Sequence, residues 1–503
     1  MTSIADAKEV GSKGRACYEW LRRNERLVAG CVAAALVVPC IWQPHIESVD
    51  LPSHVYNAWL ASLIAHGQIA GLRLVHPLTN VLADWILSGG LALFGPAWAA
   101  RILCAIAVEA FFWGTFAFTS VVNEKHAWVM TPCLAMLSYG LIFYCGWMNF
   151  YLSAACAMWM VSLLWRFRPR RLLVASLLGV AGILANPLPV AWGLSVVVYV
   201  YLFRFLPVRM RAALFATAAV GVIAVGFVLA RLFVCQWRLS EMGAAGVLAI
   251  IVPSQFLPFG TKYLLISAGI LILWLRLLLE RLDSAPFLLD PLRQLWMLNI
   301  LAFFALPSDI RFSAYGVPLG FVEWRVAFFV TIIFCAWVGG ASHGRGFTRF
   351  FSALAGVYFI FLYADALALN RADAEIASLV SELPPGQRVV ASVTDRGALL
   401  NGLRRVSDWA CIGRCFDFAN YEPSSLQFRV QATGPSRAAT ASIYAVQDME
   451  EFGYRVTSEE APLYSVCPSS VPGRRFELRK LEVGEKTCVV SLAVTPPLGH
   501  LFW

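Results

Sequence analysis

The stretch Pro44–Pro77 reads PHIESVDLPSHVYNAWLASLIAHGQIAGLRLVHP and follows the first apolar run of the chain. This first loop holds the carboxylates Glu47 and Asp50 and four of the seven histidines, in a chain that is 59% hydrophobic and 14% charged. With a mean hydropathy of +0.67, such a composition is typical of a polytopic α-helical membrane protein. Because titratable groups are scarce elsewhere, the first loop is where we expect a reaction centre.

The formal net charge of +9 does not indicate a nucleic-acid partner. The arginines and lysines stand in short clusters between apolar runs, where they are typical of cytoplasmic membrane anchors. A nucleic-acid-binding protein would instead show a basic stripe with interleaved aromatic residues, and the sequence contains none. We therefore expect membrane lipids, and no nucleic acid, around the chain.

Runs of about 20 apolar residues can cross the hydrocarbon core of a membrane. Taking the run from Leu27 to Trp42 as the first, the sequence predicts about eleven transmembrane helices. The other ten are residues 97–121, 127–145, 149–165, 172–186, 188–204, 212–234, 263–279, 294–307, 322–340 and 347–368. Residues 78–95 are also apolar, but Asp84 and Gly89-Gly90 interrupt them, so we expect a juxtamembrane segment along the membrane surface.

The distribution of basic residues predicts the orientation. With the N-terminus in the cytoplasm, the gaps on the cytoplasmic side hold most of the clustered arginines, such as Arg166, Arg168, Arg170 and Arg171. The first loop and the chain after the last span then lie outside the cytoplasm. The sequence thus predicts a membrane module over residues 1–370 in a cell membrane, with a bacterial inner membrane as the expected setting.

The C-terminal region, residues 371–503, has a different texture. Short β-branched runs such as Arg388-Val-Val-Ala-Ser-Val alternate with turn signals such as Pro384-Pro385-Gly386. We predict an extracytoplasmic (periplasmic) soluble domain of α/β or β-rich type. In that oxidising compartment one or two disulfides are more plausible than zinc, with the pairing left open among Cys411, Cys415, Cys467 and Cys488.

Asp50 and His54 are the catalytic candidates of the first loop. A carboxylate at the mouth of an aqueous cavity could accept a proton from an acceptor hydroxyl, and His54 could support it or bind a phosphate. Alternatively, Asp50 and Ser53 simply start an amphipathic surface helix over residues 54–65, with Ser53 at its N-cap, and His54 is solvated.

Basic residues in the other extracytoplasmic loops could bind a lipid-linked phosphate. Arg325 is the first candidate, followed by Arg311 and Lys262, because guanidinium forks bind phosphate oxygens in pairs. Each could equally snorkel to headgroups, or in the case of Arg325 pair with Glu323. The predicted substrate cavity further includes His76, Asn149 and Glu323, although helix capping alone would explain Asn149.

Metal and cofactor signals are weak. His45, His66 and His76 lack the close spacing of a metal pair on one helix face, so no metal site is predicted, and Glu47 is expected to face water. The sequence contains no Walker loop, dinucleotide fingerprint or His-Glu-x-x-His motif. No nucleotide or flavin is therefore expected, a requirement for a divalent metal stays open, and an activated donor would have to come from the membrane.

The layout resembles the membrane glycosyltransferases of the GT-C fold, which include protein O-mannosyltransferases and the aminoarabinose transferases acting on lipid A. The resemblance rests on Val49-Asp-Leu-Pro-Ser-His54 after the first span and on His76-Pro-Leu78. It continues through Leu93-Phe-Gly95 and Trp98-Ala-Ala-Arg101 into the second span. The chain departs from the pattern at Leu51, where many members carry a second acid, and at Val75-His76-Pro77, where a basic residue is common.

The resemblance implies sugar transfer outside the cytoplasm from a polyprenyl-phosphate-linked donor to an extracytoplasmic acceptor, with Asp50 as the catalytic carboxylate. Arg325 would be the loosely matched phosphate contact. Two alternatives belong to other classes. A lipid or polysaccharide transporter or flippase would need polar residues at mid-membrane depth and repeat symmetry, and a non-catalytic scaffold of envelope biogenesis would use the C-terminal region to bind partners.

Overall fold

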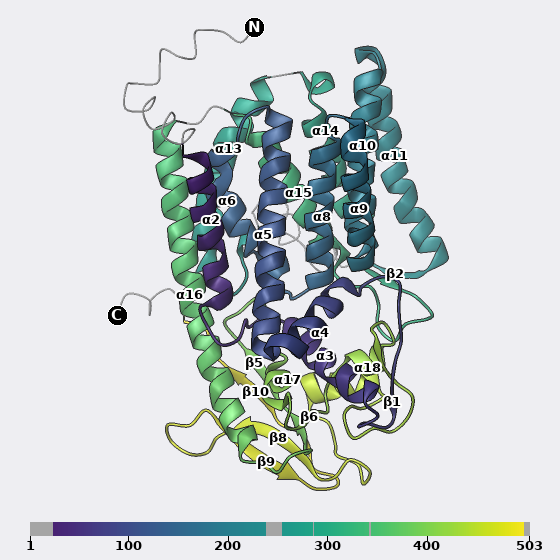
Figure 1. The fold of residues 1–503 in the computed structure, drawn as a ribbon, viewed down its shortest axis with the longest axis vertical. Helices are drawn as coiled ribbons and strands as arrows, with labels where there is room; N and C mark the ends of the chain where they lie inside the picture. Colours follow the sequence, from purple (N-terminus) through teal and green to yellow (C-terminus); the bar gives the residue numbers. More distant parts are fainter. Residues whose placement is uncertain (1–23, 238–253, 285, 342–343, 497–503) are drawn as a thin grey trace.

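The computed structural model describes residues 24–237, 254–284, 286–341 and 344–496. Long helices run side by side along the longest axis of the molecule, and the C-terminal strands gather at one end of this bundle together with α3 and α4 (Figure 1). The bundle helices are α2 Glu25–Ile41, α5 Pro96–Asn123, α6 Thr131–Ser138, α7 Leu141–Tyr144, α8 Met148–Leu164, α9 Pro169–Ala185, α10 Pro187–Phe205, α11 Val208–Leu232, α13 Tyr263–Ser284, α14 Pro291–Ala305, α15 Val322–Val338 and α16 Arg345–Ser381.

Several of these helices could span a membrane. Among the described residues, five are long and apolar enough: Pro96–Asn123, Pro187–Phe205, Val208–Leu232, Tyr263–Asp283 and Gly346–Ser381. The predicted spans all overlap helices of the bundle, but several of those helices are shorter than this length. The count of eleven spans and the orientation of the N-terminus therefore stay predictions.

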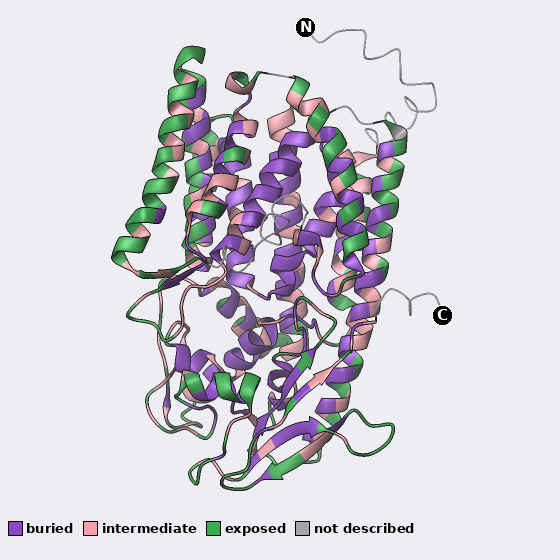
Figure 2. Cartoon of the chain, turned by 180° about the vertical axis from the view of Figure 1, so that it is seen from behind, coloured by how far each residue is buried: buried purple, intermediate pink, exposed green. Residues whose placement is uncertain are grey.

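α11 shows most clearly that the bundle suits an apolar solvent. Of its 25 residues only Gly226 is buried, while Ile223 and Phe227 are among its many exposed large apolar side chains. In Figure 2 the interior of the bundle is buried, whereas α11, at the left, is mostly exposed. α11 packs against α14 along one side and leaves the rest of its apolar surface uncovered, which is consistent with contact to lipid.

Prolines and side-chain caps set many of the helix boundaries. α5, α9, α10 and α14 all begin at a proline, the residue best suited to the first helical position. The side chain of Asn186 accepts a hydrogen bond from the Leu188 N–H at the start of α10, and Asp290 accepts bonds from the first turn of α14.

The predicted span 127–145 is broken between α6 and α7. Gly140 lies at the break, where a Cβ atom would come within 2.4 Å of the Gln255 carbonyl oxygen. Only glycine allows the 3-10 turn at Ser254–Phe256 to approach the backbone this closely. The break brings Tyr144 and Cys145 beside the first loop.

α16 joins the bundle to the C-terminal region. Its 37 residues extend over about 55 Å at the usual helical rise. The helix is continuous through residues 370 and 371, where the sequence predicted the domain boundary, and the first C-terminal strand begins at Arg388. Side chains on the last turns of α16 therefore lie close to both parts of the molecule.

The C-terminal region contains strands, as predicted. Its four-stranded sheet has the order β6-β4-β8-β9, with β4 parallel to β6 and β8, and β8 antiparallel to β9. β5 pairs with β10 in parallel. The strands are β4 Arg388–Val390, β5 Ser392–Asp395, β6 Phe416–Asp417, β7 Val430–Ala432, β8 Leu463–Pro468, β9 Phe476–Leu481 and β10 Val489–Leu492, and the short helices are α17 Val406–Cys411, α18 Glu422–Ser425 and α19 Ile443–Gln447.

The first loop is part of this C-terminal assembly. Its strand β1, Leu72–Leu74, pairs antiparallel with β7, and its helix α3, Leu51–Ala65, is followed by α4, Leu82–Phe94. Two further short strands pair with each other: β2, Val234–Gln236, follows α11, and β3, Asp309–Arg311, follows α14. Pairing between distant segments gives this end of the molecule its shape.

The predicted surface helix at residues 54–65 is wrong in its start and in its surroundings. α3 begins at Leu51 with Asp50 at the N-cap position, and its first eight residues are buried. The reason is the C-terminal region, which covers α3. Asn57 and Asn420 exchange side-chain hydrogen bonds of 3.1 and 2.9 Å, and the Asp417 N–H donates to the Tyr56 hydroxyl.

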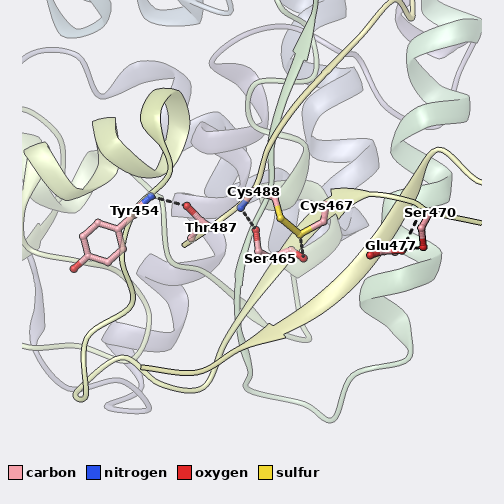
Figure 3. The surroundings of a disulfide bond; sticks show 7 residues. All are labelled: Tyr454, Ser465, Cys467, Ser470, Glu477, Thr487 and Cys488. Carbon is pink, nitrogen blue, oxygen red and sulfur yellow. Dashed lines mark hydrogen bonds between the residues drawn. A yellow bond between two sulfur atoms is a disulfide. The ribbon is translucent and has the colours of Figure 1, made fainter. Parts of the chain in front are cut away.

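The four C-terminal cysteines form two disulfides, which confirms the prediction and sets the pairing. Cys411 is bonded to Cys415, and Cys467 to Cys488. Figure 3 shows the second bond beside Ser465, whose hydroxyl accepts a hydrogen bond of 3.0 Å from the Cys488 N–H. It ties β8 to the segment that leads into β10.

Removing the Cys467–Cys488 bond is expected to destabilise the C-terminal region. The bond joins residues 21 apart in sequence, and closing such a loop lowers the entropy of the unfolded chain by an amount worth about 3 kcal/mol. The double replacement Cys467→Ser and Cys488→Ser should therefore lower the melting temperature of the purified protein. Cys31→Ser, at an exposed free cysteine, is the matched control. Equal melting temperatures in both variants would contradict the expectation.

Candidate functional site

A cavity of about 660 Å³ lies where the bundle meets the C-terminal region. Its walls come from the start of α3, the segment before α8, the loop leading into α15, and the C-terminal segments around residues 400, 421 and 450. Four predicted site residues line it: Asp50, His54, Asn149 and Arg325. The structure thus brings the carboxylate and histidine of the first loop together with an arginine that is far from them in the sequence.

Asp50 is held in place by the segment that follows α7. The Asp50 N–H donates to the Cys145 carbonyl, and the Val49 N–H donates to the Tyr144 carbonyl. This approach requires Gly146, whose φ is +79° and where a Cβ atom would stand 2.7 Å from the Asp50 nitrogen. In the described part of the chain the Asp50 carboxylate does not cap α3 and instead accepts a hydrogen bond of 3.1 Å from Trp147 Nε1.

Arg325 contacts the same indole. Its guanidinium carbon is 4.4 Å from the centre of a Trp147 ring, and its Nη1 donates to the Gly320 carbonyl at 2.9 Å. The Arg325 Nε has no hydrogen-bond partner among the residues that the structure describes. Stacking on the tryptophan orients the guanidinium fork and leaves N–H donors for an anion.

His54 follows Asp50 by one helical turn and faces the C-terminal region. Its Nδ1 lies 3.1 Å from Oε1 of Glu422, the first residue of α18, and both side chains are buried. Burial alone lowers the pKa of His54, but the hydrogen bond and charge of Glu422, with the charges of Asp84 and Asp50, outweigh it and raise this pKa from 6.5 to about 9. His54 is therefore a cation at neutral pH.

The His54–Glu422 pair predicts a pH dependence of stability. Because the pKa of His54 is higher in the folded protein than the usual 6.5, its contribution is fully present below about pH 6.5 and is lost as pH rises through about 9. A shift of this size corresponds to roughly 3 kcal/mol. The melting temperature of the wild type should fall over this range more steeply than that of Glu422→Gln. Parallel curves would contradict the expectation.

Asn149 connects the cavity to α4. Its Oδ1 accepts a hydrogen bond of 2.8 Å from the Ala83 N–H, and its Nδ2 donates to the Asn80 carbonyl at 3.1 Å. The side chain thus satisfies a free donor of the first turn of α4. We assign Asn149 to positioning the wall of the cavity, in keeping with the capping alternative.

The other four predicted residues are not among the described residues that line this cavity. Lys262 is buried in an ion pair with Asp365 of α16 and also donates to the Pro496 carbonyl at 3.1 Å. Arg311 is exposed on β3 and lines a smaller pocket that shares Asp309 and Pro318 with the cavity, and His76 is exposed. Glu323 is buried in the first turn of α15.

The sequence did not identify the polar residues that the C-terminal region contributes. Arg405 is buried, forms an ion pair with Glu450, and lies 4.4 Å from the ring centre of Tyr421. Its neighbour Arg404 is 2.9 Å from the other oxygen of Glu450. All four residues line the cavity. The adjacent arginines Arg404-Arg405 were the one visible signal, and nothing in the local pattern separated them from a solvated pair.

The histidines of the first loop have different partners, and one of them belongs to a group that could hold a metal ion. His66 is exposed, and its Nδ1 lies 2.7 Å from the Ser62 carbonyl of its own helix. His45 instead contacts Asp373 of α16. The expectation that Glu47 faces water is wrong, since only 3% of the residue is exposed. Among the described residues, His45, Glu47 and Asp373 form a group that could hold a metal ion.

Comparison with known proteins adds no family assignment. No family model matches the chain, and neither a curated protein nor a solved structure is similar to it. What the chain does must therefore be inferred from the cavity and its side chains.

Proposed function

We propose that the chain is a membrane glycosyltransferase of GT-C type that moves a sugar from a polyprenyl-phosphate-linked donor to the hydroxyl of an extracytoplasmic glycan, lipid or protein. The observation that supports this most is that Asp50 and Arg325 contact the same Trp147 side chain and line one cavity. A proton acceptor and a phosphate-binding cation are the two groups that such a transfer needs from the protein.

In the proposed reaction the acceptor hydroxyl attacks the anomeric carbon of the donor sugar. The bond between this carbon and the phosphate oxygen breaks, and polyprenyl phosphate leaves with the electron pair. Asp50 takes the hydroxyl proton, while Arg325 binds the phosphate as its negative charge increases. His54, a fixed cation one turn from Asp50, holds the start of α3 against Glu422 and keeps the carboxylate in place.

The proposed membrane placement follows from the arginine clusters. Eleven spans with the N-terminus in the cytoplasm would put the first loop, the cavity and the C-terminal region outside the cytoplasm, where a lipid-linked donor can enter from the bilayer. We propose the inner membrane of a bacterium, with a periplasmic C-terminal domain.

The transporter alternative receives less support from the described residues. It would need polar groups along a path at mid-membrane depth. The buried pair Lys262–Asp365 is closed by its own contacts, with Tyr263 donating to Asp365 at 2.8 Å and Lys262 donating to the Pro496 carbonyl. These contacts anchor the C-terminal tail to α13 and α16, which is a structural role.

The direct test uses the full chain in lipid nanodiscs supplied with a panel of polyprenyl-phosphate sugars and an extract of envelope lipids and glycans as acceptors. Release of polyprenyl phosphate, measured by mass spectrometry, should depend on the protein and on one member of the panel. If no member of the panel binds and none releases polyprenyl phosphate, the proposal is contradicted and the scaffold alternative is favoured. In that alternative, deleting the C-terminal region abolishes the cellular phenotype, whereas altering the cavity does not.

A further inference from the structure

A second cluster of chemistry-bearing groups lies where the first loop meets α16. It consists of His45 and Glu47, at the start of the loop, and Asp373, near the end of the helix. One ligand atom from each lies within 4.8 Å of the others, and His45 Nδ1 is 2.6 Å from Asp373 Oδ2. None of the three is among the described residues that line the cavity of Asp50 and Arg325.

The two carboxylates are buried without enough partners. Glu47 and Asp373 are each 3% exposed. Neither oxygen of Glu47, nor Oδ1 of Asp373, has a hydrogen-bond partner among the residues that the structure describes. Burying a carboxylate without compensation is costly, and two of them side by side also repel each other. A cation bound between the two carboxyl groups would supply the compensation that the protein's own polar groups do not.

The surroundings hold the three groups in place. The backbone of His45 is fixed by Asn370, whose Oδ1 accepts from the His45 N–H and whose Nδ2 donates to the His45 carbonyl, both at 3.0 Å. The imidazole stacks on Trp409 of α17 with ring centres 4.4 Å apart and planes within 2°. Gly402 packs against Glu47, since a Cβ atom there would meet the Glu47 carbonyl oxygen at 3.3 Å.

We propose that His45, Glu47 and Asp373 bind a divalent metal ion of the zinc or manganese class. One imidazole nitrogen and two carboxylate oxygens are ligands that such ions accept, and their two negative charges match the charge of the ion. Ligand atoms around tetrahedral zinc stand roughly 3.4 Å apart, so small side-chain rotations suffice from the observed separations. The 24% exposure of the His45 side chain leaves access for a water as the fourth ligand.

The ion would join the start of the first loop to α16, the helix that continues from the bundle into the C-terminal region. The role of the ion is structural. Glu47 precedes Asp50 by three residues, so an ion that holds Glu47 would also hold the segment that leads into the cavity wall. This inference does not depend on sugar transfer, and its test needs no substrate.

The experiment measures metal binding by the full chain in detergent. The protein is stripped with EDTA, loaded with Zn²⁺ or Mn²⁺, passed through a desalting column and analysed by mass spectrometry for metal content. The wild type should retain about one ion per chain and gain melting temperature on loading. Glu47→Gln and Asp373→Asn, which keep the side-chain shapes, should lose the ion and the thermal gain.

His66→Gln is the matched control, because His66 belongs to the same loop but is exposed and bonded to its own helix. It should bind the ion as the wild type does. The proposal is overturned if the wild type retains neither metal, or if Glu47→Gln retains the same amount as the wild type. It is also overturned if Glu47→Gln melts at a higher temperature than the loaded wild type, which would indicate that a shared proton, and no ion, compensates the two carboxylates.

Discussion

Asp50→Asn is expected to lower the rate of sugar transfer by about 10²–10⁴-fold, the usual contribution of a general base. The amide has the shape of the carboxylate and its oxygen can still accept the Trp147 Nε1–H, so the cavity wall should be unchanged. It cannot take the proton of the acceptor hydroxyl. Because the proton transfer to Asp50 takes place in the transition state, kcat should fall while KM stays near the wild-type value.

The control for Asp50→Asn is a second acid of the same cavity. Glu451 lies at the exposed rim, where Gln447 donates to its carboxylate at 3.4 Å. Glu451→Gln removes the same charge and should leave the rate within a few-fold of the wild type. Melting curves show whether each variant folds. A folded Asp50→Asn protein that transfers sugar at the wild-type rate would exclude Asp50 as the base.

The positions of the helices could be predicted from the sequence because residues at the helix ends determine where each helix begins and ends. Prolines and capping residues start α5, α9, α10 and α14 at positions close to the predicted ones. The convergence of Asp50, Asn149 and Arg325 also followed from topology, since loops on one side of a bundle can share one cavity. These are the features that hydrophobic periodicity and chain reversal determine without knowledge of distant contacts.

What could not be predicted depends on partners more than 100 residues away. The sequence predicts a solvated Glu47, but in the structure Glu47 lies against Asp373 and Gly402. It predicts Lys262 as a phosphate ligand, but in the structure Lys262 is paired with Asp365. The start of α3 has a separate, local reason: the sequence offers both Ser53 and Asp50 as capping residues, and Asp50 holds the N-cap position although its carboxylate bonds to Trp147 and does not cap the helix. A local pattern specifies the kind of residue that a position suits, while the tertiary partner decides what it does.

Arg325→Gln is the second change with a large expected effect, a loss of about 10²–10³-fold in transfer, as for the removal of a donor that stabilises developing charge. Glutamine loses both the positive charge and the fork that stacks on Trp147. Arg325→Lys should recover only part of the rate, because an ammonium keeps the charge but cannot stack on the indole and bind two phosphate oxygens together. Affinity for the product, polyprenyl phosphate, should fall in the same order, measured by competition in nanodiscs.

Arg311→Gln separates this expectation from a general effect of positive charge near the membrane. Arg311 precedes α15, whereas Arg325 lies in the first turn of that helix. Arg311 is exposed on β3 and lines a smaller pocket, which adjoins the main cavity, but it does not line the main cavity itself. If Arg325, held against Trp147, binds the phosphate, Arg311→Gln should keep nearly the full rate and product affinity while Arg325→Gln loses both. If instead the two variants weaken binding equally and salt removes the difference from the wild type, the arginines act only by attracting anionic lipid, and the leaving-group role of Arg325 is wrong.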